Sequence, residues 1–352
     1  MAVKKKAAPK RAAKRAVKKA APGAAQPVRS GSGSTAKKGR GGMLVSLILV
    51  AALGGLGLQA FYMARAKAAM KYDFVRSGSI ISQGLADGQG TGPQAVVGDP
   101  QGNIFFLDGA DRSEMRLQKF DRTEAFVAKY KPVKAEQVLG RAQDMDVDAA
   151  GNVYVLKADG TVLELDNDLK FKAAVTVKVA DPGVLAVGPD GHLYVASAGA
   201  NKVQVFGADG SVITEFGAAG THSGDIAAPS RMCFDGAGDL AVLENLPDAP
   251  RIKVFDKSLK LERSFKMLGL HMVPPLRIQA DNHGRLFVND SAGDSGIRVY
   301  NLANGDQTGQ VLGTAQGDLF VSPGSIGVNR FTGTIMVHTI PGLIPCVMPA
   351  GH

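Results

Sequence analysis

From Ser77 onward the chain alternates short apolar runs with polar turns. Six of these runs follow a glycine and share one pattern: GNIFFLD from Gly102, GNVYVLK from Gly151, GHLYVAS from Gly191, GDLAVLE from Gly238, GRLFVND from Gly284 and GTIMVHT from Gly333. Their period-two alternation and their β-branched and aromatic residues are typical of strands. We therefore expect an all-β domain in this part of the chain.

Each run lies in a longer repeat, in which an apolar strand and an Asp-x-x-Gly turn come before it and a further strand follows it. The following strands read MRLQKFD from Met115, VLELD from Val162, VQVFG from Val203, IKVFD from Ile252, IRVYN from Ile297 and LIPCVM from Leu343. The turn glycines are 49, 40, 47, 46 and 49 residues apart. This period suits one four-stranded propeller blade per repeat.

The repeat resembles an NHL-type six-bladed β-propeller over about 275 residues. Its Asp-x-x-Gly-Asn-apolar-aromatic-Val signature is intact from Asp99 and Asp148, whereas Gly188 replaces the aspartate in the third copy. The sixth copy ends after its third strand, so the resemblance implies that 77–83 supplies the missing outer strand. The predicted propeller spans 77–352.

A stretch of 24 uncharged residues, Gly41–Ala64, comes before the repeats and is long enough to span a bilayer. We predict a transmembrane helix at 43–64 in the inner (plasma) membrane, followed by a stalk at 65–76. The 13 Lys and Arg residues before the span place the N-terminus in the cytoplasm and the propeller in the periplasm or outside the cell. A cleaved signal peptide ending near Ala64-Arg65-Ala66 is the alternative.

The basic residues are concentrated in the first 42 positions. This Lys/Ala-rich tail has no hydrophobe larger than Val apart from Met1, so we expect it to be disordered. Its charge predicts binding to anionic lipid, with nucleic acid as an alternative cytoplasmic partner. Ala51 and Gly55, four residues apart, also permit close packing of two membrane helices as a homodimer.

The remainder of the chain is mildly acidic, since the tail supplies 13 positive charges and the whole chain has a net charge of +9. This remainder, at −4, therefore lacks the basic surface of a nucleic-acid-binding domain. Its two cysteines, Cys233 and Cys346, are too few for a disulfide framework, and we expect two buried thiols.

Two rings of residues are expected at the mouth of the central channel, where propeller ligands usually bind. One comprises Ala95, Asp144, Val184, Arg231, Arg277 and Ser325; the other comprises Asp108, Lys157, Ser197, Glu244, Asp290 and Thr339. Arg231 and Arg277 suit an anionic ligand or a partner's carboxylate. Alternatively they pair with Glu244 and Asp290 in structural salt bridges. The candidate binding residues are Asp108, Asp144, Arg231, Arg277, Glu244 and Asp290.

A metal site is the competing interpretation. Propellers of the gluconolactonase and paraoxonase type resemble this architecture and hold a divalent cation at the channel mouth. By that resemblance, Glu244, Asn245, Asn289 and Asp290 would bind calcium in a lactonase-like hydrolase.

We predict a membrane-anchored, non-catalytic scaffold that binds a protein of the cell envelope without a cofactor. The calcium-dependent hydrolase and a basic-tail anchor for nucleic acid or lipid are the alternatives, because a propeller fold does not fix function.

Overall fold

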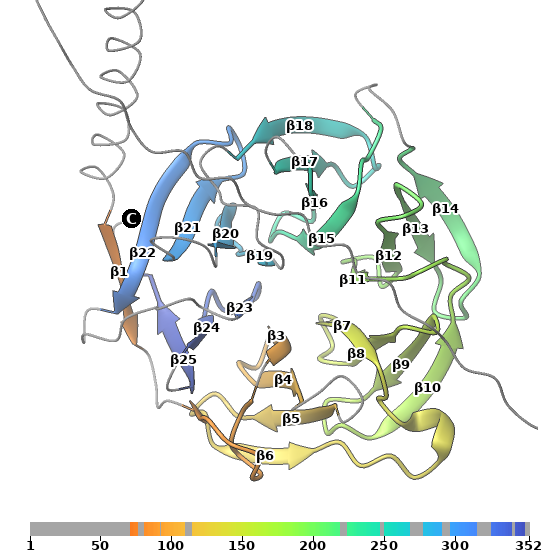
Figure 1. Cartoon of the computed structure of the whole chain (residues 1–352), viewed down its shortest axis with the longest axis vertical. Coiled ribbons are helices and arrows are strands. Elements are labelled where there is room, and N and C mark those ends of the chain that lie inside the picture. The colour runs from red at the N-terminus through yellow and green to blue at the C-terminus, as the bar shows by residue number, and fades with distance from the viewer. Residues whose placement is uncertain are drawn as a thin grey trace, which may run out of the picture. The chain divides into compact units, whose positions relative to one another are not determined.

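The computed structural model describes residues 71–76, 81–91, 93–109, 115–218, 224–246, 250–267, 277–290, 296–314, 325–339 and 342–348. These form an all-β, six-bladed propeller (Figure 1). Within these ranges no helix has the length and apolar character needed to cross a membrane. The predicted tail at 1–42 and span at 43–64 lie outside them, so both stay predictions.

The blades follow one another around the central axis, and each runs from an inner strand to an outer one (Figure 1). The inner strands are β3 Pro93–Gly98, β7 Ala142–Val147, β11 Val184–Val187, β15 Pro229–Phe234, β19 Arg277–Ala280 and β23 Ser325–Val328. The second strands are β4 Ile104–Asp108, β8 Val153–Lys157, β12 Leu193–Ser197, β16 Leu240–Glu244, β20 Arg285–Asp290 and β24 Ile335–Thr339. The second strands thus coincide with the six glycine-led runs.

The outer half of each blade completes the antiparallel sheet. The third strands are β5 Arg116–Phe120, β9 Thr161–Leu165, β13 Lys202–Phe206, β17 Arg251–Phe255, β21 Gly296–Asn301 and β25 Gly342–Val347. The outer strands of blades one to five are β6 Phe126–Lys129, β10 Phe171–Thr176, β14 Val212–Phe216, β18 Leu261–Lys266 and β22 Gln307–Thr314. A short 3₁₀ helix, η1 Ala135–Gln137, connects the first blade to the second.

The N-terminal segment closes the ring at the sixth blade. In β2 Ile81–Ser82, Ile81 pairs with Leu343 of β25. Upstream, β1 Lys71–Arg76 pairs with β25 in antiparallel fashion through Val75–Arg76 and with β22 in parallel fashion. The stalk expected at 65–76 is therefore a strand from Lys71 onward. The reason is that the unpaired edges of β22 and β25 offer backbone partners to this segment.

The core consists of six apolar clusters, one for each pair of neighbouring blades. The cluster between blades six and one is built on Phe106, Met336 and Leu343, and Ile81 packs into it. Both cysteines lie buried and unpaired, as expected. The clusters fix the positions of the inner strands around the axis, so the side chains that line the channel are carried by a rigid scaffold.

The Asp-x-x-Gly turns end the inner strands in a common way. In the first blade, Oδ1 of Asp99 accepts hydrogen bonds from the backbone N–H groups of Gln101 and Asn103. Gly102 closes the turn at a φ of 87°, in the left-handed region that glycine adopts without strain. All six inner strands run in the same direction, so these turns share one end of the channel and the starts of the strands share the other.

Candidate functional site

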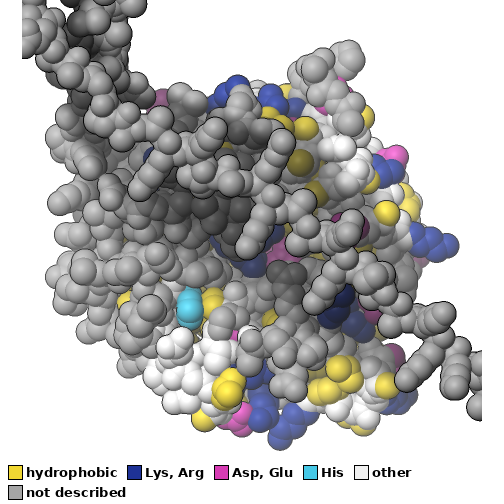
Figure 2. Space-filling model, in the orientation of Figure 1, with side chains coloured by type: hydrophobic (Ala, Val, Ile, Leu, Met, Phe, Trp, Pro, Cys, Tyr) yellow, Lys and Arg dark blue, Asp and Glu magenta, His cyan; other side chains and the backbone are white. Residues whose placement is uncertain are grey.

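Charged side chains from the inner strands line the central channel. All six blades line a narrow cavity on the axis, with a volume of about 20 Å³. That is room for about one water molecule. Around the periphery, by contrast, Figure 2 shows basic, acidic and apolar side chains interspersed on one face. The channel is therefore the place to look for a localised charge arrangement.

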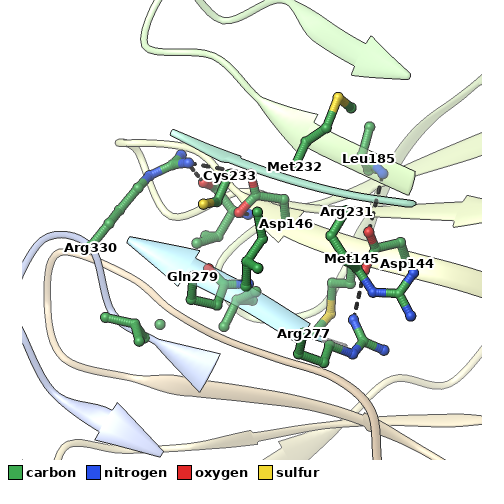
Figure 3. Close-up of a pocket in the computed structure, with 15 residues that line it drawn as sticks. Asp144, Met145, Asp146, Leu185, Arg231, Met232, Cys233, Arg277, Gln279 and Arg330 are labelled. Carbon is green, nitrogen blue, oxygen red and sulfur yellow. Dashed lines mark hydrogen bonds and ion pairs between the residues drawn. The ribbon is translucent and has the colours of Figure 1, made fainter. Parts of the chain in front are cut away.

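One charged cluster lies toward the strand starts and joins opposite sides of the channel. Nη1 of Arg277, in blade five, is 3.4 Å from Oδ1 of Asp144, in blade two. The other oxygen of Asp144 accepts the N–H of Leu185 at 3.1 Å. Arg231 enters the same region from blade four and donates to the carbonyl of Ser230 (Figure 3). The structure therefore brings together Asp144, Arg231 and Arg277, which are members of the first predicted ring.

A second charged cluster lies nearer the turns. Oδ2 of Asp146 accepts the N–H of Val187 at 2.7 Å and lies 3.3 Å from Nη1 of Arg330. Arg330 reaches across from blade six, and its Nη2 also donates to the carbonyls of Val147 and Val187. Figure 3 shows Cys233 beside this pair. Arg330 thus fastens blade six to blades two and three on the far side of the axis.

Burial dominates the electrostatics of this second cluster. Desolvation raises the pKa of Asp146, although the Arg330 guanidinium and two backbone N–H groups oppose the shift. Burial also raises the pKa of the Cys233 thiol, with the carboxylates of Asp235 and Asp146 adding to the effect. A thiol with a raised pKa is a poor nucleophile, so Cys233 acts as a packing residue.

Asp108, predicted at the channel mouth, is a structural residue. It is fully buried, and its two oxygens receive Nε and Nη2 of Arg116, each at 2.8 Å. Oδ2 also accepts the N–H of Thr91 at 2.7 Å. Arg116 in turn donates to the backbone carbonyls of Gly84 and Gln89. The pair therefore fixes the loop that leads into the first inner strand.

Glu244 occupies the equivalent place in blade four and has an equivalent role. Its Oε1 accepts the N–H of Ala227 at 2.8 Å and lies 3.5 Å from Nζ of Lys253. Its Oε2 is 2.6 Å from Nε of Arg251, a close ion pair without hydrogen-bond alignment. The prediction that Glu244 pairs with Arg231 or Arg277 is wrong, because its two oxygens face Lys253 and Arg251 instead.

The predicted calcium ligands do not form a free oxygen cluster. Both oxygens of Glu244 face cationic side chains, which disfavours a divalent ion. Asn289 is buried and lies opposite Arg277 in the strand register, and Asn245 is half-buried. The side chain of Asp290 lies outside the description. The part of the chain that the structure describes holds no group of three His, Cys, Asp or Glu residues placed to bind a metal.

Sequence reasoning missed the second cluster. Asp146 stands two residues after Asp144 on the same strand, so strand alternation predicts that both share one face. Arg330 follows the turn Asn329 in the copy that contains the extra residue, where the repeat gives no alignment. The place of Asp146 in the channel could therefore have been predicted from the sequence, whereas the contact made by Arg330 depends on ring closure.

Comparisons with known proteins support the fold. No protein-family model and no curated protein matches the chain. Among solved structures, a streptogramin B lyase superposes with a TM-score of 0.54 and 13% identity, covering 79% of this chain and 98% of the lyase. A catalytically inactive variant of virginiamycin B lyase from Staphylococcus aureus, solved with quinupristin, gives a TM-score of 0.50 at 15% identity, covering 78% of this chain and 89% of the other. At such identities the likeness concerns the propeller architecture alone.

Proposed function

We propose that this protein is a membrane-anchored binding module whose NHL-type propeller recognises a carboxylate-bearing partner protein of the cell envelope. The uncharged segment at 43–64 supports an anchor in the inner membrane, and the basic flank supports a propeller in the periplasm or outside the cell. The basic tail is then a cytoplasmic contact for anionic lipid, or for nucleic acid. Pairing of two membrane helices through Ala51 and Gly55 would bring two propellers together.

The observation that carries the proposal is the environment of Arg277. Its side chain is 8% exposed, and a guanidinium carries five N–H donors. Within the described residues, the side chain of Arg277 makes one hydrogen bond, the 3.4 Å contact to Asp144. A buried guanidinium with unused donors next to Arg231 is suited to a carboxylate, which accepts two N–H groups in a fork-like arrangement.

The size of the channel favours binding over catalysis. A cavity of about 20 Å³ has no room for a lactone or a macrocycle, so a partner's carboxylate would be held at the mouth of the channel. The alternative calcium-dependent hydrolase needs Glu244 as a ligand, and Arg251 and Lys253 already face its oxygens. The lyase activity named for the structural neighbours belongs to those proteins and rests on their own sites.

The proposal is tested by titrating the full-length chain, purified in a mild detergent, with a labelled acetylated peptide that contains glutamate. The matched probe replaces glutamate with glutamine. We expect the glutamate peptide to bind, and Arg231→Gln and Arg277→Gln each to weaken it tenfold or more, since a charged hydrogen bond contributes about 1.5–3 kcal/mol. Arg231→Gln leaves the Asp144–Arg277 pair in place.

The control is Lys172→Gln, which removes an exposed cation on the outer strand β10. Equal affinity for the two peptides, or equal weakening by Lys172→Gln, would show that the channel arginines do not recognise a carboxylate.

A further inference from the structure

A large groove lies at the opposite end of the channel, over the turns that end the inner strands. Its volume is about 970 Å³, and apolar surface makes up most of its lining. Phe234 and Tyr194 form the apolar floor, with ring centroids 4.9 Å apart in an edge-to-face arrangement, and Phe331 adds to it. The rim carries carboxylates from the turns of neighbouring blades. Volume and lining are those of a ligand-binding groove.

The turn aspartates of blades one, two and five use both carboxylate oxygens. In the second blade, Oδ1 of Asp148 accepts backbone N–H groups, and Oδ2 accepts Nδ2 of Asn152 at 2.7 Å. In the fifth blade, Oδ2 of Asp281 accepts Nε of Arg285 at 2.7 Å. The donor in each case is the side chain four positions after the aspartate. The repeat therefore contains its own partner for the second oxygen.

Blade four breaks this rule at Asp235. Its Oδ1 accepts the N–H groups of Ala237 and Asp239, each at 2.9 Å, as in the other copies. The residue four positions on, however, is Asp239, which has no donor to offer and pairs with Arg263 instead. Oδ2 of Asp235 therefore accepts no hydrogen bond from any residue that the structure describes.

The position of Asp235 makes this oxygen significant. The residue is 8% exposed and lines the groove. Burial and the neighbouring Asp239 carboxylate raise its pKa, although the backbone N–H groups of Asp239, Ala237 and Gly238 oppose the shift. Its second oxygen is not enclosed by protein, so a ligand in the groove can donate a charged hydrogen bond to it.

The other carboxylates of the groove also favour a cationic ligand. Asp190 and Asp256 line it, and hydrogen bonds from neighbouring groups lower the pKa of both carboxyls, so both are ionised at neutral pH. Arg330 also borders the groove, but its guanidinium is committed to Asp146 and to two backbone carbonyls. Lys257 is the other cation of the lining. The groove is thus apolar at its floor and acidic at its rim.

We infer that this groove binds a basic segment of a partner protein, in which an arginine or lysine donates to Oδ2 of Asp235 and flanking apolar side chains pack on Phe234 and Tyr194. Charge complementarity and the extent of the groove over the turns of several blades favour a peptide segment. The site is independent of carboxylate recognition at Arg277, because the two lie at opposite ends of the inner strands. The propeller then has two binding faces, one for a carboxylate at the channel mouth and one for a basic segment in the groove.

The test is fluorescence polarisation of the full-length chain with a labelled, acetylated peptide Leu-Ala-Arg-Ala-Leu. The matched probe carries neutral citrulline in place of arginine. We expect the arginine peptide to bind at least tenfold more tightly than the citrulline peptide. Asp235→Asn should abolish that difference while keeping Oδ1 as the acceptor for the turn, so the variant should melt at or above the wild-type temperature.

Two controls make the result specific. Asp121→Asn changes an exposed turn aspartate of blade one, outside the groove, whose Oδ1 accepts the N–H groups of Thr123 and Ala125, and binding should be unchanged. Arg277→Gln should also leave this binding intact. Equal binding of the two peptides by the wild type, or full binding of the arginine peptide by folded Asp235→Asn, would overturn the inference.

Discussion

At the residue scale, the chain uses buried carboxylates to hold its loops. Asp108 and Glu244 stand at the same position of two blades, and each receives an arginine from the start of the next strand. Each also accepts a backbone N–H from the loop before the inner strand of its blade, from Thr91 or Ala227. From residue type and position we predicted that both residues bind a ligand at the channel mouth. Their structural role follows from the adjacent strand, which brings a cationic side chain within reach of each carboxylate.

The structural role of Glu244 predicts a large effect of Glu244→Gln. The amide keeps an acceptor for Ala227 but removes the negative charge that faces Arg251 and the buried Lys253. Removing one partner of a buried ion pair typically costs about 3–5 kcal/mol. We therefore expect the free energy of unfolding in urea to fall by about 3 kcal/mol.

Glu215→Gln is the matched control, because its partner Lys202 lies 2.7 Å away in an exposed pair. Pairs of that kind contribute less than about 1 kcal/mol. Similar losses for both variants would mean that Glu244 has no special structural role.

His338 predicts a pH dependence of stability. Burial lowers the pKa of its imidazole, although the Asp108 carboxylate opposes the shift. The unfolded chain therefore binds a proton near pH 6.5 that the native protein binds only at lower pH. The contribution of His338 to stability is fully present above about pH 6.5 and is lost as the pH falls below it.

The measurement is the unfolding free energy of the wild type and of His338→Gln between about pH 8 and pH 5, on either side of the ordinary histidine pKa. We expect the advantage of the wild type over the variant to shrink on acidification. Parallel profiles for the two proteins would contradict the assignment of a neutral, buried imidazole.

At the element scale, the strands and turns follow from local sequence, while the closure does not. The glycine-led runs predict the second strands because alternation and turn chemistry are both local signals. The pairing of β1 with β22 and β25 is different, since Lys71–Arg76 shows no repeat and joins strands far away in the sequence. Its partners are defined only once the ring has formed.

The closure predicts a disulfide in an Arg76→Cys variant. Arg76 is paired with Cys346 in the antiparallel register. Paired residues in such ladders have Cα atoms about 4.5–5.5 Å apart, within disulfide range. Mild oxidation should therefore link the two ends of the propeller, raising the free energy of unfolding by about 4 kcal/mol.

Mass spectrometry of peptides under non-reducing conditions identifies the link. The control is Val75→Cys, which is paired with Val347 and should remain reduced. A free thiol at position 76 after oxidation, or equal linkage of both variants, would contradict the register of the closing strand.

At the scale of the whole molecule, ring closure sets what the channel contains. The sequence placed Asp144, Arg231 and Arg277 at the mouth, and they do lie together on the axis. It did not predict that Asp144 pairs with Arg277, because these residues belong to opposite blades that meet only across the closed ring. The contact of Arg330 with Asp146 across the axis could not be predicted for the same reason.

The proposed membrane anchor has a testable consequence for the full-length chain in cells. An uncharged segment at 43–64 should keep the protein in the membrane pellet after alkaline carbonate washing, with the propeller exposed to protease added from outside. Deleting 43–64 should move the protein to the soluble fraction. Release of the unaltered protein by carbonate, or a mature N-terminus near Arg65, would show a peripheral or cleaved form instead.

The measurement that tests the central claim most directly is photo-cross-linking in living cells from a reactive residue placed at Arg141. This position is exposed and lies three residues before Asp144. The account predicts a cross-link to a discrete envelope protein that disappears in Arg277→Gln and is absent when the reactive residue is at Lys172 on the outer rim. The same cross-links with intact and altered Arg277, or none at Arg141, would contradict a carboxylate-recognising channel mouth.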